Sequence, residues 1–466
     1  MFHGFSPAYW LTLHGLIAVL AVLTYVIASH VMHQRRHPTA AIAWVLFILL
    51  MPYVALPAFL LFGSRKRSRD RGLPFPRVSS ASAGLSWPVQ TIVAMGQPAP
   101  APYRDFALHV DGKQALAALW DVLDSAQHSI DVCTFILGRD PIGEAVIARL
   151  CAKAKSGVKV RLLLDGLGSL MAGRPRMRAL SDCGSEFLLF VPPLHSPLKG
   201  RTNLRDHRKL LVVDAGHDSR RLWCGGRNLA SEYFEGSAGR EAWHDLSFDL
   251  RGPLVLQAHA LFEHDWAFAR GRRYVTLPSP ATWQPAPASS GAQLIASGPD
   301  QVDDTIYSLL VTAAYRAQSA IALVTPYFVP DSALLTALCL AARRGVVVDL
   351  LIPARSNHRM SDVARNRALR SLADAGAHVW LAPHMVHAKL AVVDDVLALA
   401  GSANLDSRSL FLNYELMFAF HSAPDVAQFR DWFDAERATA CAYVADRPSF
   451  VRDVAEGAVL WLGFQL

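Results

Sequence analysis

The chain has 466 residues, which exceeds one ordinary domain and predicts two or three. Hydrophobic residues make up 52% of it, enough for a large core with apolar sequence left over for a membrane. The net charge of +7 suits an anionic partner, either nucleic acid or an acidic lipid surface, and alone decides neither. None of the six cysteines forms a C-x-x-C pair, so we expect buried free thiols in a reducing compartment and no cysteine-based zinc site.

Two long apolar runs, 9–32 and 39–62, open the chain. Each is long enough to cross ~30 Å of hydrocarbon, which takes about 20 residues. A cleaved signal peptide fits the first run poorly, because no basic region precedes it, no A-x-A site follows it, and a second run comes at once. We therefore predict a transmembrane hairpin over 1–72. Pro52 and Pro57 interrupt the second run, so a shallow re-entrant hairpin remains the alternative.

Basic residues predict how this hairpin is oriented. The loop between the runs carries Arg35 and Arg36. A richer segment follows the second run and contains Arg65, Lys66, Arg67, Arg69 and Arg71. Because the more basic side of a membrane protein is usually cytoplasmic, both ends of the chain are predicted to lie inside.

The rest of the chain is divided by segments rich in Pro, Ala and Ser. Residues 73–103 end in QPAPAP and are typical of a tether between a membrane and a catalytic body. A second such linker, 277–291, separates two globular halves, 104–276 and 292–466.

The two halves repeat each other. In each half, a helix with apolar 3–4 spacing leads to a glycine and a β-branched run, 157–164 in the first and 345–352 in the second. Strands that alternate with helices predict an α/β fold. The duplication predicts two α/β/α units packed face to face as a pseudo-dimer.

One sequence motif occurs once in each half. Residues 207–214 read HRKLLVVD and residues 387–394 read HAKLAVVD, so both have the form H-x-K-x4-D. A Gly-rich Asn motif follows each copy, GGRN at 225–228 and GSAN at 401–404. One such motif could arise by chance on a buried strand, but two copies in equivalent places of a repeat indicate a shared functional site.

The residue types of this motif suit phosphodiester chemistry. If the motif lies on a strand, the His and Lys of each copy share a face, because side chains i and i+2 point the same way. A neutral imidazole can attack phosphorus, and lysine supplies positive charge for the phosphate oxygens. One His would form a phosphohistidine, and the other would protonate the leaving alcohol and deprotonate the incoming one. With two lysines and the Asn228, Ser402 and Asn404 donors, the reaction needs no metal or cofactor. Asp214 and Asp394 complete the motif and are expected to be structural.

These motifs resemble the phospholipase D superfamily, and the whole chain is similar to bacterial cardiolipin synthases with an N-terminal membrane hairpin. Further segments carry the likeness to the synthases: 36–44 (RHPTAAIAW), 325–331 (TPYFVPD), 404–410 (NLDSRSL) and 413–415 (NYE). The doubled motif is typical of the superfamily, and the hairpin together with 325–331 is typical of the synthase branch.

The resemblance implies specific roles. His207 would be the nucleophile and His387 the general acid and base. A downstream carboxylate would orient each imidazole, Asp245 for His207 and Glu415 for His387. Two departures from exact repetition stand out: Gly226 replaces the hydroxyl of Ser402, and the loop after Asp214 is about four residues longer than its twin.

The implied reaction transfers a phosphatidyl group from one phosphatidylglycerol to another, giving cardiolipin and glycerol at the bacterial inner membrane. A hydrolytic phospholipase D, or a transferase that uses another alcohol such as ethanolamine, would carry the same motifs. A nucleic-acid phosphodiesterase is disfavoured by the membrane hairpin and by the lack of an aromatic-basic patch. A catalytically silent membrane scaffold is disfavoured by the two intact motifs. The apolar C-terminus could pack on the core or touch the bilayer.

Overall fold

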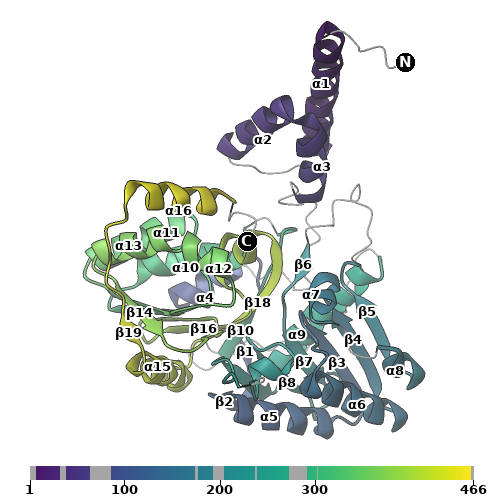
Figure 1. The fold of residues 1–466 in the computed structure, drawn as a ribbon. Coiled ribbons are helices and arrows are strands. Elements are labelled where there is room, and N and C mark those ends of the chain that lie inside the picture. The colour runs from purple at the N-terminus through teal and green to yellow at the C-terminus, as the bar shows by residue number, and fades with distance from the viewer. Residues whose placement is uncertain are drawn as a thin grey trace. The chain divides into compact units, whose positions relative to one another are not determined.

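A computed structural model describes residues 7–31, 38–62, 85–173, 177–192, 204–236, 239–271, 291–301 and 303–462. They divide into a small unit, formed mainly by the N-terminal helices, and a large unit that holds both repeats. Figure 1 shows the element order.

The small unit contains three apolar helices, α1 (Pro7–Val31), α2 (Pro38–Leu50) and α3 (Pro52–Phe62). The three pack on one another, with the rings of Tyr25 and Trp44 lying 4.8 and 5.4 Å from the ring of Phe59. Among the described residues, one helix is long and apolar enough to cross a membrane, over Trp10–Ile27. Its side chains are mostly exposed within the unit, as expected of a helix that faces lipid.

The predicted second span, 39–62, is not one helix. α2 ends at Leu50 and α3 begins at Pro52, because proline has no amide hydrogen to donate and its ring clashes with the preceding turn. Each piece is shorter than the about 20 residues that a straight span needs. The basic residues 65–71 lie outside the described residues.

The first repeat is built on a seven-stranded sheet in the order β2-β9-β8-β7-β3-β4-β5. Its strands are β2 (Arg104–His109), β3 (Ser129–Thr134), β4 (Lys159–Leu164), β5 (Glu186–Leu189), β7 (Leu210–Val213), β8 (Arg221–Gly225) and β9 (Ser247–Arg251). Its helices are α5 (Gly112–Ser125), α6 (Pro141–Lys155), α7 (Gly166–Met171), α8 (Met177–Asp182) and α9 (Leu254–Ala269), with a 3-10 turn at Ser231–Tyr233. α5 and α6 lie along one side of this sheet (Figure 1).

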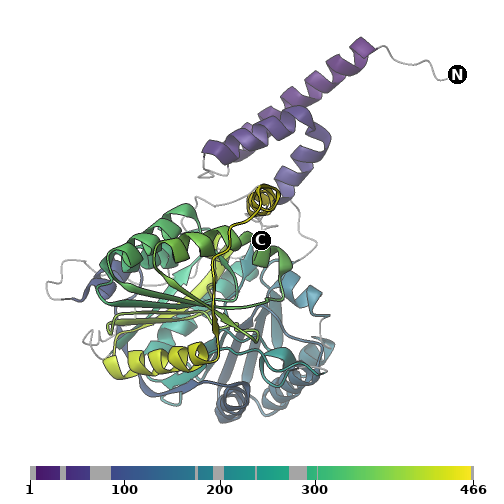
Figure 2. The ribbon, with the colours of Figure 1, turned by 60° about the vertical axis from the view of Figure 1, so that its left-hand side comes forward.

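The second repeat uses the same order of strands, β10-β18-β16-β15-β11-β13-β14. Its strands are β10 (Gly291–Ser297), β11 (Ala320–Val324), β13 (Val347–Pro353), β14 (His378–Ala382), β15 (Leu390–Val393), β16 (Leu397–Gly401) and β18 (Asn413–Phe420). Its helices are α10 (Thr305–Arg316), α11 (Ser332–Arg343), α12 (Arg359–Ala364), α13 (Asn366–Asp374), α14 (Ser407–Phe411), α15 (Ala423–Ala438) and α16 (Phe450–Leu462). Figure 2 shows α10 and α11 on one side of this sheet and α15 on the other.

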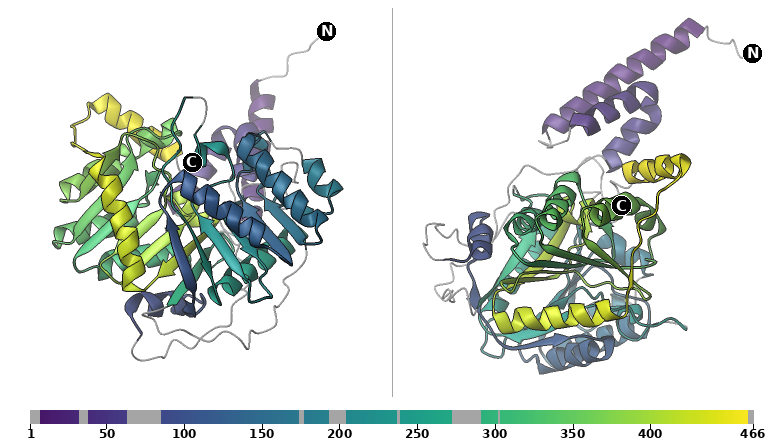
Figure 3. Two further views of the ribbon diagram at one scale, coloured as in Figure 1. Left: turned by 90° about the horizontal axis from the view of Figure 1, so that it is seen from below. Right: turned by 90° about the vertical axis from the view of Figure 1, so that its left-hand side faces the viewer.

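Strand pairing confirms the predicted duplication. β3 pairs in parallel with β4 and antiparallel with β7, and β11 pairs in the same way with β13 and β15. The two repeats lie side by side (Figure 3). Phenylalanine rings from both repeats contact one another. The rings of Phe248 in β9 and Phe106 in β2 lie 5.3 and 5.0 Å from that of Phe420 in β18.

The tether predicted over 73–103 is wrong in its second half. Residues 73–84 lie outside the described residues, but α4 (Trp87–Ala94) then buries Val89, Ile92 and Val93. β1 (Ala101–Pro102) pairs with β10, and the buried Gln97 side chain accepts a hydrogen bond from Ala296. A proline-rich sequence can thus be part of a core when its few free polar groups find partners. The predicted linker 277–291 lies outside the described residues except for Gly291, the first residue of β10.

The structure also bears on the cysteines and on the C-terminal segment, whose environment the sequence left open. All six cysteines are free as expected, but Cys151 and Cys183 are only partly buried and Cys441 is exposed. The C-terminal α16 is held to α13 by ion pairs from Arg370 to Glu456 and from Arg367 to Asp453, and it exposes Phe450.

Candidate active site

Both motif copies lie directly before a strand rather than within it. β7 begins at Leu210 and β15 begins at Leu390, each one residue after the motif lysine. The expectation that His and Lys lie on the strand itself is therefore wrong. The four residues that follow each lysine are buried, and they fix the extended His-x-Lys segment to the core.

Each His-x-Lys segment is hydrogen-bonded to the other repeat. The backbone N–H of His207 donates to the carbonyl of Tyr414 at 2.9 Å, next to the pairing of β6 (Arg205–Asp206) with the start of β18. The backbone N–H of His387 donates to the carbonyl of His244 at 2.6 Å, beside a bridge between His244 and Val386. These exchanged contacts bring the two motifs into one site.

The carboxylates that orient the histidines are exchanged in the same way. Nδ1 of His207 lies 3.0 Å from Oε2 of Glu415, and Nδ1 of His387 lies 2.7 Å from Oδ2 of Asp245. The prediction that Asp245 serves His207 and Glu415 serves His387 is therefore wrong in its pairing. The reason lies in the backbone: Glu415 follows the residue that binds the His207 amide, and Asp245 follows the residue that binds the His387 amide.

These contacts define the chemistry of each imidazole. With Nδ1 donating to a carboxylate, Nε2 is the nitrogen left for the substrate. Aromatic rings that the sequence did not mark enclose the histidines: Phe135 lies 5.0 Å from His207, and Tyr233 and Trp243 lie 5.1 and 5.3 Å from His387. Of these three rings, that of Trp243 lies two residues before Asp245 in the sequence, which is a signal that could have been used.

Both lysines are fully buried beside their histidines. Nζ of Lys209 donates to the carbonyl of His207 at 2.6 Å. Nζ of Lys389 contacts the backbone carbonyl of His387 and lies 2.9 and 3.0 Å from its two ring nitrogens. Burial lowers the pKa of Lys209 to about 8 and that of Lys389 to about 7.

The electrostatic coupling also crosses between the repeats. Burial and then the charge of Lys389 lower the pKa of His387 to about 3. Burial is likewise the main cause of the lowered pKa of His207, to which both Lys209 and Lys389 contribute. Both imidazoles are thus held neutral, which is the form that can attack phosphorus or accept a proton.

Both carboxylates are held in the ionised form. Burial alone would raise the pKa of Asp245 and of Glu415, but the facing histidine and the lysines hold each pKa below its ordinary value. The site therefore contains two neutral imidazoles, two anionic carboxylates and two lysines in one buried network.

The Gly/Ser difference between the repeats has a structural cause. The hydroxyl of Ser402 donates to Oε2 of Glu415 at 2.5 Å and accepts from the amide of Leu416 at 3.0 Å. At the equivalent Gly226, an added Cβ would lie 2.2 Å from Oδ1 of Asp245. The shorter carboxylate thus fills the space of a side chain at 226, and the hydroxyl of Ser402 positions Glu415 in this structure.

The two asparagines of the Gly-rich motifs differ in their contacts. Oδ1 of Asn228 accepts from the amide of Ile136 at 3.3 Å, and its Nδ2 donates to the Tyr233 hydroxyl at 2.8 Å. Asn404 is buried, and its Oδ1 has no hydrogen-bond partner within the described ranges. Phosphate binding by either amide stays a prediction.

Asp214 and Asp394 bind backbone amides rather than the histidines. The carboxylate of Asp214 accepts from the amides of Gln127, His128 and Ser129, the last two at 2.7 and 2.9 Å. Asp394 makes the equivalent contacts to the start of β11, including 2.9 Å to the amide of Ala320. Both residues also adopt the left-handed backbone conformation, with φ of 50° and 48°. These contacts are those of an anchor for the turn before the central strand.

We expect Asp214→Ala to lower the free energy of unfolding by about 2–4 kcal/mol. The substitution leaves several amides without a charged acceptor, and alanine tolerates a positive φ less well than aspartate. Urea unfolding measures the loss. Asp214→Asn keeps the backbone preference and should cost less, and equal effects of the two substitutions would contradict an anchoring role for the charge.

Arg208 is a residue of the site that the sequence did not reveal. It stands between His207 and Lys209, and its twin in the second motif is Ala388. Its buried guanidinium pairs with Asp265 and donates from Nε to the carbonyl of Glu415 at 3.1 Å. Arg208 thus fixes the backbone that carries Glu415. The positive charge of Arg208 between His207 and Lys209 was the feature of the sequence that could have revealed this role.

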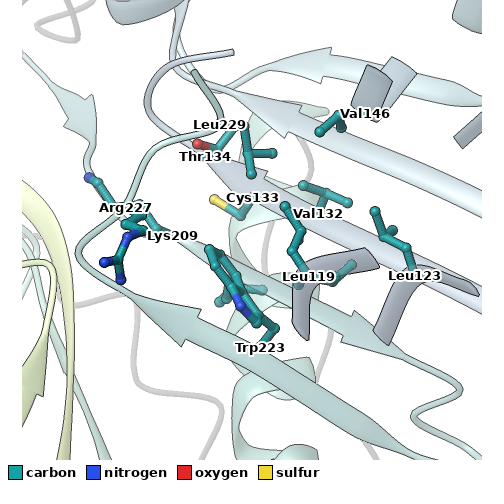
Figure 4. A pocket seen from close by; sticks show the side chains of 12 residues that line it. Leu119, Leu123, Val132, Cys133, Thr134, Val146, Lys209, Trp223, Arg227 and Leu229 are labelled. Carbon is teal, nitrogen blue, oxygen red and sulfur yellow. The ribbon is translucent and has the colours of Figure 1, made fainter. Parts of the chain in front are cut away.

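An apolar pocket lies within the first repeat (Figure 4). Leu119, Leu123 and Val146 lie at one end of the view, and Lys209 and Arg227 lie at the other. Its lining includes Lys209 but neither motif histidine, so it belongs to the core rather than to the reacting centre.

Comparison with known proteins agrees with this geometry. The family described as "Cardiolipin synthase, PLD-like domain" matches residues 119–266 and 310–437, which together form more than half of the chain. The chain belongs to this family. A second family, described as "Phospholipase_D-nuclease N-terminal", matches residues 17–64, so the N-terminal helices also have a counterpart.

Curated relatives match over nearly the whole chain. The chain is 30% identical over 461 residues to "Cardiolipin synthase 1" of Bacillus anthracis, covering 91% of this chain and 88% of the relative. It is 30% identical over 434 residues to "Cardiolipin synthase A" of Pseudomonas putida, covering 88% of each. Among solved structures, phosphatidylserine synthase of Haemophilus influenzae has the same fold, with a TM-score of 0.59 at 13% identity over 78% of this chain and 97% of that one. In this family the apolar Trp10–Ile27 helix indicates association with a membrane.

Proposed function

We propose that this protein is a phosphatidyltransferase that makes cardiolipin from two molecules of phosphatidylglycerol and releases glycerol. The observation that carries the proposal is the paired site: each neutral imidazole is held by an ionised carboxylate from the other repeat, beside a buried lysine. Family membership supports phosphatidyl transfer, and the names of the relatives support cardiolipin as the product.

The proposed mechanism has two half-reactions. Nε2 of His207 attacks the phosphorus of the first phosphatidylglycerol while Nε2 of His387 gives a proton to the departing glycerol. Because His387 is neutral in the free site, the proton it gives must be taken up as the substrate binds, and Asp245 stabilises the imidazolium. His387 then takes the proton from the hydroxyl of the second phosphatidylglycerol, whose oxygen attacks the phosphohistidine and frees His207. Lys209 and Lys389 supply positive charge for the phosphate oxygens, with Asn228 and Asn404 as further proposed donors.

Glu415 and Asp245 are proposed as positioning residues in this scheme. Each fixes the tautomer of its histidine and stabilises the positive charge that appears on the ring during proton transfer. The reaction as written needs no metal ion or cofactor.

We also propose that the chain crosses the membrane more than once and that the catalytic part lies on the cytoplasmic side. The basic segment 65–71 supports this orientation through its excess of Lys and Arg. The same segment would attract anionic lipid headgroups to a site that uses them as substrates.

Mass spectrometry of lipids tests the proposed reaction. The full chain, reconstituted into vesicles that contain phosphatidylglycerol alone, should produce cardiolipin and glycerol, and His207→Ala should abolish both. His217→Ala is the matched control. His217 lies in the loop after Asp214, and its ring stacks on that of His128 rather than on a residue of the active site. Phosphatidic acid in place of cardiolipin would make the enzyme a phospholipase D. If only added ethanolamine supported turnover, the acceptor would be a different alcohol.

The lysines predict a decline of activity at alkaline pH. A lysine is cationic below its pKa, so the phosphate-binding charge is lost as the pH rises through about 7 for Lys389 and about 8 for Lys209. We expect kcat/KM for a short-chain phosphatidylglycerol to fall above this range, whereas kcat falls later because bound phosphate raises both pKa values. In Lys389→Arg the guanidinium keeps its proton, so the decline should shift to higher pH. The same pH dependence of kcat/KM in Lys389→Arg and in the wild-type chain would contradict the role of Lys389 in binding the phosphate.

A further inference from the structure

A second cluster, of two histidines and one glutamate, joins the two repeats beside the active site. His244 comes from the segment before β9, His384 from the segment after β14, and Glu436 from α15. Nδ1 of His244 lies 2.9 and 3.1 Å from Oε1 and Oε2 of Glu436, and Nε2 of His384 lies 2.9 Å from Oε2. Two imidazole nitrogens from different repeats thus converge on one carboxylate.

Glu436 has no Lys or Arg partner within the described ranges, where its ion pairs are with His244 and His384 alone. A comparable cluster, Asp131 with His259 and Glu263, differs because Arg161 pairs with both carboxylates at 2.6 Å. A guanidinium already fills the place of a cation there.

The two imidazole rings lie against each other, with ring centroids 3.6 Å apart and planes inclined by 23°. Imidazole nitrogens are common ligands of transition metals. The cluster therefore combines two imidazole nitrogens with one carboxylate, and their ligand atoms lie within 4.8 Å of one another.

We propose that His244, His384 and Glu436 bind one divalent transition-metal ion of the zinc class. Two imidazoles and one carboxylate are a zinc ligand set, whereas magnesium and calcium prefer oxygen ligands alone. Metal–ligand bonds of 2.0–2.2 Å in a tetrahedral site place ligand atoms roughly 3.3 Å apart. Each imidazole nitrogen lies 2.9–3.1 Å from the carboxylate, within a few tenths of an ångström of this value, and all three ligand atoms lie within 4.8 Å of one another. Water would complete the coordination.

The ion would act as a clamp rather than as a reactant. The carbonyl of His244 accepts from the amide of His387, and the next residue, Asp245, holds the ring of His387. His384 lies three residues before His387 on the other side of this contact. An ion that joins His244 to His384 and Glu436 would therefore keep the carboxylate of Asp245 in hydrogen-bonding position beside His387. This consequence rests on the proposed function, but binding of the ion does not.

Metal binding to the full chain tests the proposal directly. The untagged protein in detergent, freed of metal with a chelator, should bind one equivalent of Zn²⁺, measured by elemental analysis and by competition with a chromophoric chelator. Co²⁺ in place of Zn²⁺ should give the visible absorption of a four-coordinate site. Glu436→Gln and His384→Ala should each weaken Zn²⁺ binding at least ~100-fold. The matched control His259→Ala, in the cluster that contains Arg161, should leave it unchanged.

Several results would overturn the site. They are a wild-type chain that binds Zn²⁺ no more tightly than the His384→Ala/Glu436→Gln double variant, loss of binding in His259→Ala, or a site that accepts only Mg²⁺ or Ca²⁺. Thermal unfolding of each variant checks the fold, and Glu436→Gln keeps the size and hydrogen-bonding capacity of the side chain. Zinc bound normally to a chain that makes no cardiolipin would leave the metal site standing and refute the proposed function alone.

Discussion

Replacing Glu415 with glutamine should lower the rate of phosphatidyl transfer roughly 10³-fold or more while the protein stays folded. The carboxylate holds Nδ1 of His207 as a donor, which leaves Nε2 free to attack phosphorus. An amide can present its NH2 group instead and so favour the opposite tautomer. It also removes the negative charge that stabilises an imidazolium. Asp245→Asn should have an effect of the same size through His387. Initial rates with phosphatidylglycerol vesicles measure both losses.

Because each histidine contacts a carboxylate of the other repeat, the pairing itself can be tested separately from the loss of activity. Double-mutant cycles in urea unfolding should give coupling energies of about 1–3 kcal/mol for His207 with Glu415 and for His387 with Asp245. The same-repeat pairs, His207 with Asp245 and His387 with Glu415, are the matched controls and should be closer to additive. Larger coupling within a repeat than between repeats would contradict the contacts of Nδ1 in this structure.

The duplication itself could be predicted from the sequence, because it depends on local patterns. Glycine followed by a β-branched run marks β4 and β13, and the repeated H-x-K-x4-D marks the segments before β7 and β15. Each signal spans fewer than ten residues, so no long-range information is required. The residues of the site could be chosen in the same way, because His, Lys and carboxylate are the types that phosphoryl transfer needs.

The pairing of Glu415 and Asp245 could not be predicted, because it depends on how the repeats dock. Backbone hydrogen bonds from His207 to Tyr414 and from His387 to His244 join residues far apart in the chain. Amino-acid composition led to two further wrong predictions, a tether over residues 87–102 and a single helix over 39–62. Residues 87–102 are rich in proline yet join the core through α4 and β1, and the apolar run 39–62 is divided before Pro52.

The assignment of His207 as the nucleophile predicts a burst of product in one variant and none in another. A phosphatidyl ester of p-nitrophenol has a leaving group that departs as an anion, so it needs no proton from His387. We therefore expect His387→Ala to release about one equivalent of nitrophenol per chain rapidly and then to stall, because no general base activates the acceptor. His207→Ala should give no burst, and the wild-type chain should turn over continuously.

The stalled variant should carry the phosphatidyl group on His207, and peptide mapping by mass spectrometry locates it. A phosphohistidine is labile in acid and stable in base, which distinguishes it from a serine or aspartyl ester. The geometry gives the reason for the expected asymmetry. Nζ of Lys389 lies 2.9 and 3.0 Å from the two ring nitrogens of His387. Nζ of Lys209 instead donates to the backbone carbonyl of His207 and faces the ring of Phe135, so we expect Nε2 of His207 to be open to phosphorus. A burst in His207→Ala, with label on His387, would reverse the two roles, and no burst in His387→Ala would contradict the prediction that this variant accumulates a phosphatidyl-His207.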